Sequence, residues 1–240
     1  MSATETLPDR GCPYPGLRPF RMDEEDVFFG RNKQIDEILL RLKTHQFLGI
    51  VGSSGCGKSS VIRAGVLPAL RSGLMGKLGS TWYIADMKPG DTPILNLATA
   101  LLQSGVLATD GQLPEQDQGL AAALLAARLR QSDVALVRLL LERQLPEFSN
   151  LVILADQFEE IFRFQQRDPE EALAFVNLLL ATAQELRVRA FVLLTMRSDF
   201  LGQCALFPGL PEALNDSQFL CPRLTRTQLR EAIQLPALVG

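Results

Sequence analysis

The chain has 240 residues, of which 47% are hydrophobic and 21% are charged, and its formal net charge at pH 7 is −3. This length suits one large domain or one and a half, and the apolar fraction predicts a substantial hydrophobic core and excludes wholesale disorder. The slightly acidic charge argues against a broad basic surface for nucleic acid, although a local patch is not excluded.

Four cysteines, Cys12, Cys56, Cys204 and Cys221, are scattered along the chain and form no C-x-x-C pair. This pattern predicts free thiols in a reducing compartment and no metal site built from clustered cysteine and histidine. The sequence has neither an N-terminal apolar signal segment nor an uninterrupted apolar run of membrane length. We therefore expect a cytoplasmic, soluble protein.

The N-terminal part predicts little regular structure before its first helix. Residues 1–13 are polar and aperiodic and are expected to be a flexible leader, and the prolines of residues 13–20 favour an extended segment. An acidic run at residues 23–26 is interpreted as solvated surface. The first helix is expected to have Asn32 as its N-cap and to carry an apolar face at Ile35, Ile38, Leu39 and Leu42.

Five short apolar runs predict strands, and helical patterns lie between them. The expected strands are residues 47–51, 81–85, 151–155, 190–195 and 218–221. The expected helices are residues 60–70, 93–102, 120–130, 133–144 with Ser132 as cap, 168–186 opened by Asp168 and Pro169, 198–204 with Ser198 as cap, and a last helix opened by a Thr225–Gln228 capping box. Residues 104–119 are expected to form a loose connection. This alternation predicts an α/β domain with a mostly parallel sheet and helices on both faces.

The first strand and the following helix flank a segment that fits the phosphate-binding pattern G-x-x-x-x-G-K-[ST]. Its glycines allow the backbone to curl around a phosphate, and its amide groups and the helix N-terminus then face the anion. Lys58 is expected to reach the β- and γ-phosphates, and the Ser59 hydroxyl to ligate Mg²⁺. The alternative is a Gly- and Ser-rich surface turn. The predicted nucleotide-binding residues of this loop are Gly52, Ser53, Ser54, Gly55, Cys56, Gly57, Lys58, Ser59 and Ser60.

A second part of the site is predicted where later strands end. Asp156 follows a buried strand, which places its carboxylate at the sheet edge that binds ligands in such folds, and predicts the Mg²⁺-holding acid. The alternative is an aspartate that caps a helix or forms a turn. Glu159 and Glu160 are candidates to orient or deprotonate the attacking water, with Glu159 favoured, or else belong to a solvated helix start. Arg197 could sense the γ-phosphate, or be a surface arginine paired with Asp199.

With these residues in hand, the chain resembles the STAND class of P-loop NTPases, and specifically the novel STAND NTPase 1 family. The resemblance extends from Pro13 to the end of the chain. It rests on six ordered segments: residues 13–20, 28–31, 52–70, 156–160, 197–201 and 232–237.

The resemblance implies an ATP-driven switch that is ADP-bound and closed at rest, and ATP-bound and self-associated when active. It also makes Gly30 and Arg31 candidate contacts of the adenine or ribose. Asn32 and Gln34 stand where the family pattern often has acidic residues, which puts any role of those acids in doubt. Cys56 replaces the usual small polar residue of the loop, and this change is expected to leave binding intact but to make the site sensitive to thiol oxidation.

The implied organisation is the leader at residues 1–13, a P-loop NTPase core at 14–222 and the beginning of a helical lid at 223–240. Pro222 and Pro236 are weak candidates for the lid's contact with the nucleotide. Because the family carries further domains, the chain is expected to be a fragment or a truncated product, with low ATPase activity. The missing C-terminal part would be a protein-binding repeat array, often of WD repeats, in signal transduction or bacterial defence.

Two alternatives to a signalling switch stay open at this point. One is an interaction scaffold that binds nucleotide but has lost hydrolysis. The other is a small-molecule kinase on the same scaffold, against which the scarcity of arginine between residues 103 and 128 argues. The sequence does not decide between ATP and GTP, nor between Glu159 and Glu160 as the base.

Overall fold

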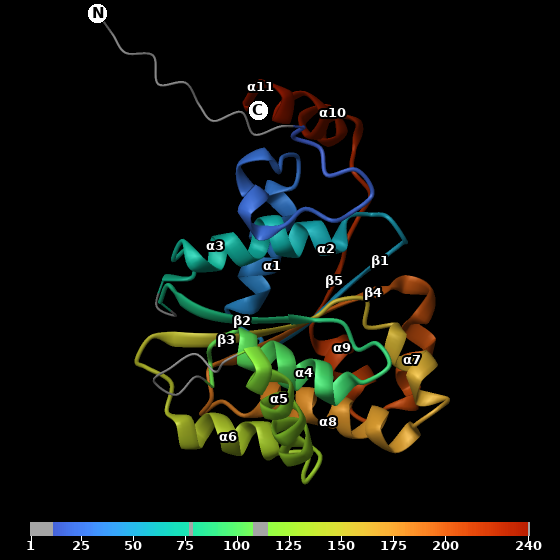
Figure 1. The fold of residues 1–240 in the computed structure, drawn as a ribbon. Coiled ribbons are helices and arrows are strands. Elements are labelled where there is room, and N and C mark those ends of the chain that lie inside the picture. Colours follow the sequence, from blue (N-terminus) through green and yellow to red (C-terminus); the bar gives the residue numbers. More distant parts are fainter. Residues whose placement is uncertain (1–11, 77–78, 108–114, 240) are drawn as a thin grey trace, which may run out of the picture.

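The computed structural model describes residues 12–76, 79–107 and 115–239, and its centre is a five-stranded parallel sheet with the order β2-β3-β4-β1-β5 (Figure 1). The strands are β1 (Phe47–Gly52), β2 (Thr81–Met87), β3 (Ser149–Ala155), β4 (Ala190–Arg197) and β5 (Gln218–Leu220). Every neighbouring pair runs parallel. All five predicted strands and the predicted α/β class are confirmed.

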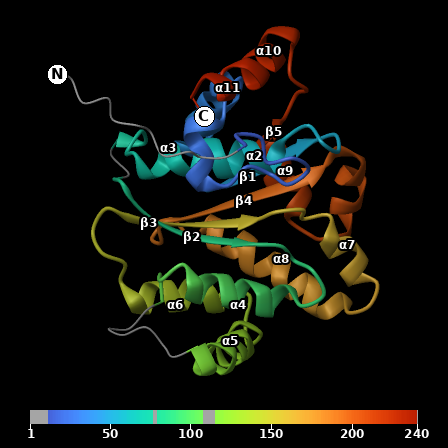
Figure 2. The same ribbon diagram turned by 45° about the horizontal axis from the view of Figure 1, so that its top comes forward.

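Helices cover both faces of this sheet (Figure 2). In β3, Leu151, Ile153 and Ala155 belong to one buried hydrophobic cluster, whereas Val152 and Leu154 belong to another. Successive residues of a strand point to opposite faces, so a continuous apolar run supplies both clusters at once. The first cluster includes side chains of α4 (Pro93–Gln103), α6 (Ala135–Arg143) and α8 (Pro169–Gln184), and the second includes side chains of α1 (Asn32–Leu42) and α3 (Leu67–Arg71).

The remaining elements complete the layers. They are α2 (Lys58–Ser60), α5 (Glu115–Leu129), α7 (Glu160–Gln165), α9 (Leu210–Asp216), α10 (Arg226–Gln234), α11 (Pro236–Val239), the 3₁₀ segments η1 (Met22–Val27) and η4 (Ser198–Leu206), and the π-helical segment η2 (Val61–Val66). In the described part of the chain, no helix combines the length and apolarity needed to cross a membrane.

The helix after the phosphate-binding pattern is not the continuous α-helix that we predicted. It consists of α2, the π-helical η2 and α3, and the Leu67 amide donates to the carbonyl of Ile62. Pro68 has no N–H group to donate to the carbonyl four residues earlier, so an α-helical register cannot be kept through this turn. A π-helical turn accommodates the missing donor, and such turns are frequent at functional sites.

Several helix starts were predicted well and others were not. Asp168 caps α8 by accepting from the Glu171 amide, and Thr225 and Gln228 form the predicted capping box of α10. Three caps were wrong by one or two residues, because the N-cap of α1 is Arg31, that of α6 is Val134 and that of η4 is Arg197. None of these three uses a side-chain cap, so the polar residues nearby gave a misleading signal.

Two predicted irregular segments extend into parts that the structure does not describe. Residues 1–11 of the expected leader and residues 108–114 of the expected connection lie outside the described residues. Residues 104–107 form a turn after α4, in agreement with the expected connection, but residues 115–119 were predicted wrongly, because α5 begins at Glu115 and not at residue 120. The helix expected to reach residue 186 ends at Gln184.

The N-terminal segment and the C-terminal helices lie side by side, on the side of the sheet that carries α1, α2 and α3 (Figure 1). The Tyr14 hydroxyl donates to the carbonyl of Ile233 over 2.5 Å. Gly30, at φ +81°, approaches α10 so closely that a Cβ would lie 2.5 Å from the carbonyl oxygen of Gln228. Only glycine fits there, since its backbone conformation and the space both exclude a side chain.

Candidate nucleotide-binding site

The phosphate-binding pattern forms a tight loop between β1 and α2. Gly55 and Gly57 both adopt positive φ, at 71° and 92°, and the Cys56 amide donates to the carbonyl of Ser53 over 3.3 Å. The Lys58 ammonium donates to the carbonyls of Gly52 and Ser53, each over 3.0 Å. The loop therefore has the backbone shape that turns amides toward an anion, with a cation held over it.

Ser59 and Asp156, which lie 97 positions apart in the sequence, meet at the carboxyl edge of the sheet. The Ser59 hydroxyl donates to Oδ1 of Asp156 over 2.6 Å, and the hydroxyl of Thr195 donates to the same oxygen over 2.6 Å. Asp156 is only 1% exposed. The strand order explains the meeting, because β1 and β3 are both neighbours of β4, which carries Thr195.

Arg63 and Asp86 extend this network toward the surface, where Asp86 is exposed, and the sequence reasoning missed both. The Arg63 guanidinium donates to Oδ2 of Asp156 over 2.8 Å and to both carboxylate oxygens of Asp86 over 2.6 and 2.7 Å. Two signals were present. Arg63 lies four residues after Ser59 in a helical stretch. Asp86 comes directly after the expected strand 81–85, just as Asp156 comes directly after the expected strand 151–155.

The surroundings keep Asp156 ionised. Burial alone would raise its pKa, but hydrogen bonds from Ser59 and Thr195 and the charge of Arg63 together hold the pKa of this carboxyl below its usual value. Arg63 is correspondingly held as a cation, because the carboxylates of Asp86 and Asp156 raise its pKa. Asp156 and Arg63 therefore form an ion pair at the centre of the site, in which each charge stabilises the other.

The Ser59 and Asp156 oxygens suit a magnesium ion. Mg²⁺ prefers hard oxygen ligands, keeps several waters and is usually bound through one or two protein groups plus the phosphates of a substrate. Within residues 12–76, 79–107 and 115–239, no group of three or more His, Cys, Asp and Glu side chains is placed to hold a metal. A metal at this edge would therefore need phosphate oxygens to complete its coordination.

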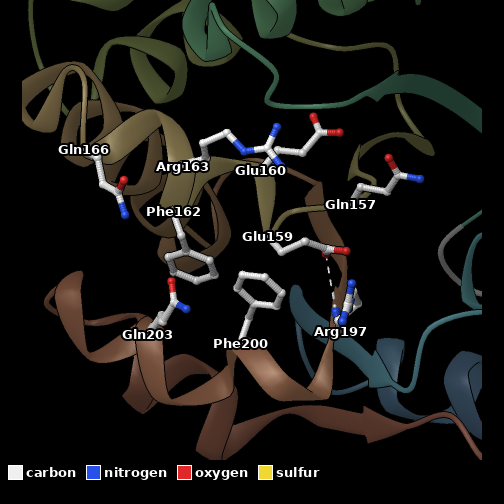
Figure 3. A pocket seen from close by; sticks show the side chains of 9 residues that line it. All are labelled: Gln157, Glu159, Glu160, Phe162, Arg163, Gln166, Arg197, Phe200 and Gln203. Carbon is white, nitrogen blue, oxygen red and sulfur yellow. Dashed lines mark hydrogen bonds between the residues drawn. The ribbon is translucent and has the colours of Figure 1, made fainter.

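The residues after Asp156 turn sharply and line a separate cavity of about 490 Å³ (Figure 3). Gln157 has φ +55°, and its amide donates to the Thr195 hydroxyl over 3.0 Å. The cavity is lined by side chains of the 157–166 segment and of the 197–203 segment, among them Glu159, Glu160 and Arg197. These three predicted residues therefore lie together at the ends of β3 and β4, whereas Ser59 follows β1.

Their contacts are with groups of the protein itself, and their predicted roles toward the nucleotide stay predictions. Glu159 accepts from the Arg197 amide over 3.3 Å, and Glu160 accepts from the Gly90 amide over 3.1 Å. The Arg197 guanidinium pairs with Asp199 over 2.6 Å and is exposed, which is the surface alternative that the sequence left open. The geometry alone does not single out either glutamate as a base.

Arg31 lies at the opposite side of the loop and is buried, at 3% exposure. Its guanidinium donates to the Cys56 carbonyl over 2.5 Å and to the Pro222 carbonyl over 2.8 Å. Arg31 thus joins the phosphate-binding loop to the segment that leads into α10. Its predicted contact with the base or ribose stays a prediction, as does that of Gly30, which faces Gln228.

The parallel sheet, the glycine loop before a helix and the Ser59–Asp156 pair define a P-loop NTPase domain. The family model of Novel STAND NTPase 1 matches residues 13–239. The chain therefore belongs to that family.

A curated relative agrees with the nucleotide-binding class. The chain is 31% identical over 77 residues to the protein from Pectobacterium atrosepticum named Aliphatic sulfonates import ATP-binding protein SsuB. The match covers 31% of this chain and 28% of that protein. The chain therefore spans little more than a quarter of the length of this relative, and the likeness reaches no further than those 77 residues.

Proposed function

We propose that the chain is an ATP- and ADP-binding module in which the bound nucleotide controls a conformational and oligomerisation switch, with slow hydrolysis of ATP. The observation that carries the proposal is the contact of Ser59 with Asp156, which joins the loop after β1 to the ends of β3 and β4. A magnesium ion brought by the nucleotide would bind at this junction. Binding of this ion would therefore affect the ends of β1, β3 and β4 together.

The region around α10 supplies the moving part of the proposed switch. We assign residues 14–222 to the core and 223–240 to the start of a lid. In support, Arg31 links the phosphate-binding loop to Pro222, and Gly30 abuts Gln228 on α10. A nucleotide that reshapes the loop would therefore change the seat of the lid helix. The ADP form would hold the lid closed, and the ATP form would release a surface for self-association.

The slow rate of the proposed hydrolysis rests on the contacts of the candidate water-activating groups. Both Glu159 and Glu160 accept hydrogen bonds from backbone amides, and Arg197 is paired with Asp199. An interaction scaffold with vestigial hydrolysis is the second candidate, and these same contacts favour it. Within a longer protein, either module would pass a signal between partner domains, in sensing or defence.

Two measurements on the purified chain test the proposal. Native mass spectrometry is expected to show bound ADP, and light scattering is expected to show a larger assembly with Mg²⁺ and a non-hydrolysable ATP analogue than with ADP. Absence of bound nucleotide together with no heat on titration with Mg-ATP would contradict nucleotide binding. Binding without any change in assembly or in protease protection of α10 would contradict the switch and favour the scaffold.

A further inference from the structure

Two cysteines from distant parts of the sequence meet behind the phosphate-binding loop. Cys56 lies within the loop, and Cys221 follows β5. Both press on Gly52, where a Cβ would lie 2.8 Å from the Cys56 sulfur and 3.4 Å from the Cys221 Cβ. Both side chains are buried in the same hydrophobic cluster, and each is close enough to shift the pKa of the other.

The backbone around this pair is fixed on both sides. The Cys221 amide donates to the Val51 carbonyl over 2.7 Å, which continues the pairing of β5 with β1. On the other side, the buried guanidinium of Arg31 binds the carbonyls of Cys56 and Pro222. The two thiols therefore do not meet by chance contact of mobile side chains, because the chain segments that carry them are held together by one backbone hydrogen bond and by the Arg31 side chain, which binds a carbonyl of each.

The charges around the pair make the two thiols unequal. The hydrogen bond from Cys221 and the nearby Lys58 and Arg31 outweigh burial and lower the pKa of Cys56 to about 6. The Lys58 ammonium lies 3.9 Å from the Cys56 sulfur. The hydrogen bond to Cys56 and burial raise the pKa of Cys221, so it keeps its proton. The thiolate is the form that attacks a peroxide, and a second cysteine beside it can resolve the sulfenic acid that results.

We propose that Cys56 and Cys221 form a reversible disulfide when the protein meets a hydroperoxide, and that this bond fastens the phosphate-binding loop to the segment that leads into α10. The described cysteines are all reduced in the structure. A transient, signal-dependent disulfide is the kind expected of a protein from a reducing compartment.

The reaction balances with one hydroperoxide per bond. The Cys56 thiolate attacks the terminal oxygen, the O–O bond breaks, and Cys56 becomes a sulfenic acid while the leaving oxygen takes up the proton that the Cys56 thiol released to solvent when it ionised. The Cys221 sulfur then attacks the Cys56 sulfur, the S–O bond breaks, and the departing hydroxide takes the Cys221 proton and leaves as water. With hydrogen peroxide, two thiols are oxidised, the peroxide is reduced, and two waters form. A dithiol reductant reverses the bond.

Nucleotide binding and oxidation should oppose each other. The amide of Cys56 belongs to the loop that would hold the phosphates, so a polyphosphate would sit close to the Cys56 sulfur. Its negative charge would disfavour the thiolate and slow the attack on peroxide. This protection rests on the proposed function, whereas formation of the bond without nucleotide does not, so the two can fail separately.

The test treats the nucleotide-free chain with hydrogen peroxide and maps its peptides by mass spectrometry without reduction. We expect one linked pair, Cys56 with Cys221, that a dithiol releases. The variant Cys221→Ser should lose the pair and leave a sulfenic acid on Cys56 that dimedone traps. The variants Cys12→Ser and Cys204→Ser should form the pair as the parent does, because Cys12 is exposed and distant and burial raises the pKa of Cys204 to about 11.

Two results would overturn the proposal. One is a folded, peroxide-treated chain with no Cys56–Cys221 peptide, and the other is a loss of the free Cys221 thiol to peroxide that is as fast in Cys56→Ser as in the parent. The serine replacement restores the small polar residue expected at this loop position, and far-ultraviolet circular dichroism verifies its fold. Saturating Mg-ADP is expected to slow formation of the bond about twofold at pH 7, because a rise of about one unit from a pKa of about 6 lowers the thiolate fraction of Cys56 from about nine-tenths to about half. An unchanged rate would overturn the protection alone.

Discussion

The two halves of the site are built in different ways. Around Asp156, four side chains form a buried network in which both carboxylate oxygens have partners and a guanidinium balances the charge. Around Glu159 and Arg197, the side chains line an open cavity and bind either backbone amides or an exposed partner. The first half is fixed before any ligand arrives, whereas the second must rearrange to act. This contrast supports a module that binds nucleotide firmly and hydrolyses it slowly.

The largest effect is expected from Asp156→Ala. It removes the acceptor of two hydroxyl groups and one of the two partners of a largely buried guanidinium, which should cost about 3 kcal/mol of unfolding free energy. Urea unfolding followed by circular dichroism measures the loss. As the matched control, Asp199→Ala removes an exposed ion-pair partner of Arg197 and should leave the unfolding midpoint unchanged. Equal effects of the two replacements would refute the contrast.

Lys58→Ala is expected to have the next largest effect, and on binding instead of folding. The ammonium contacts groups of its own loop, namely two carbonyls and the Cys56 sulfur, so its loss should leave stability close to that of the parent. Loss of its charge-assisted contacts with phosphate should weaken Mg-ATP binding about a hundredfold. Isothermal titration measures the affinity, with the exposed Lys33→Ala as control. Equal affinities of the two variants would disprove the assignment of the loop.

Glu159→Gln probes the open half. If Glu159 orients or deprotonates the attacking water, the replacement should lower kcat for ATP hydrolysis about a hundredfold without changing nucleotide affinity. Glu160→Gln is the matched comparison, since Glu160 lies one residue along and accepts from the Gly90 amide. The reverse order of effects would assign the base to Glu160. No loss in either variant would favour the scaffold with vestigial hydrolysis.

A smaller effect is expected from acid. The folded state lowers the pKa of Asp156 relative to the unfolded chain, so ionised Asp156 stabilises the fold. This contribution is full above the ordinary carboxyl pKa and is lost as the pH falls through the lower folded-state value. The stability difference between the parent and Asp156→Asn should therefore shrink from neutral to strongly acidic pH in urea titrations. A difference that is independent of pH would show that Asp156 acts through packing alone.

The smallest effect is expected from Arg197→Ala. Its guanidinium pairs with an exposed carboxylate and stacks over Phe200 at the rim of the cavity, so the unfolding midpoint should not move measurably. A loss of turnover with intact stability would restore the predicted γ-phosphate contact. A destabilised variant would instead show that the rim is more rigid than its contacts suggest.

Much of the fold was predictable because strong local patterns and tertiary packing agree. The runs that became β1, β3 and β4 are apolar on both faces, and a buried parallel strand is the structure that suits them. The segment that became α9 was not predicted as a helix, and α7 was anticipated only as the helix-start alternative for Glu159 and Glu160. Both are short, so few residues were available to show a helical period.

The residues of the site also divide into those with a local sequence signal and those without one. The glycine loop and the strand-ending Asp156 carry local signals, and the structure brings them together. Arg63 was missed because its role depends on two carboxylates that reach it only through the strand order. The sequence also gave no sign that Cys56 and Cys221 approach each other, since their contact follows from the pairing of β5 with β1. The position of a side chain within a loop can be predicted from the neighbouring sequence, whereas its contacts with residues of other strands depend on the strand order.

Arg31 gives the molecule a mechanical property. One planar guanidinium donates to two carbonyls that belong to segments 166 positions apart, so a single side chain connects the phosphate-binding loop with the segment that leads into α10. A lysine has only a point-like ammonium and cannot reproduce the fork. A tilt of the C-terminal helices and a change in the shape of the loop are therefore coupled. Either change must move the other segment as well or break one of the two Arg31 hydrogen bonds.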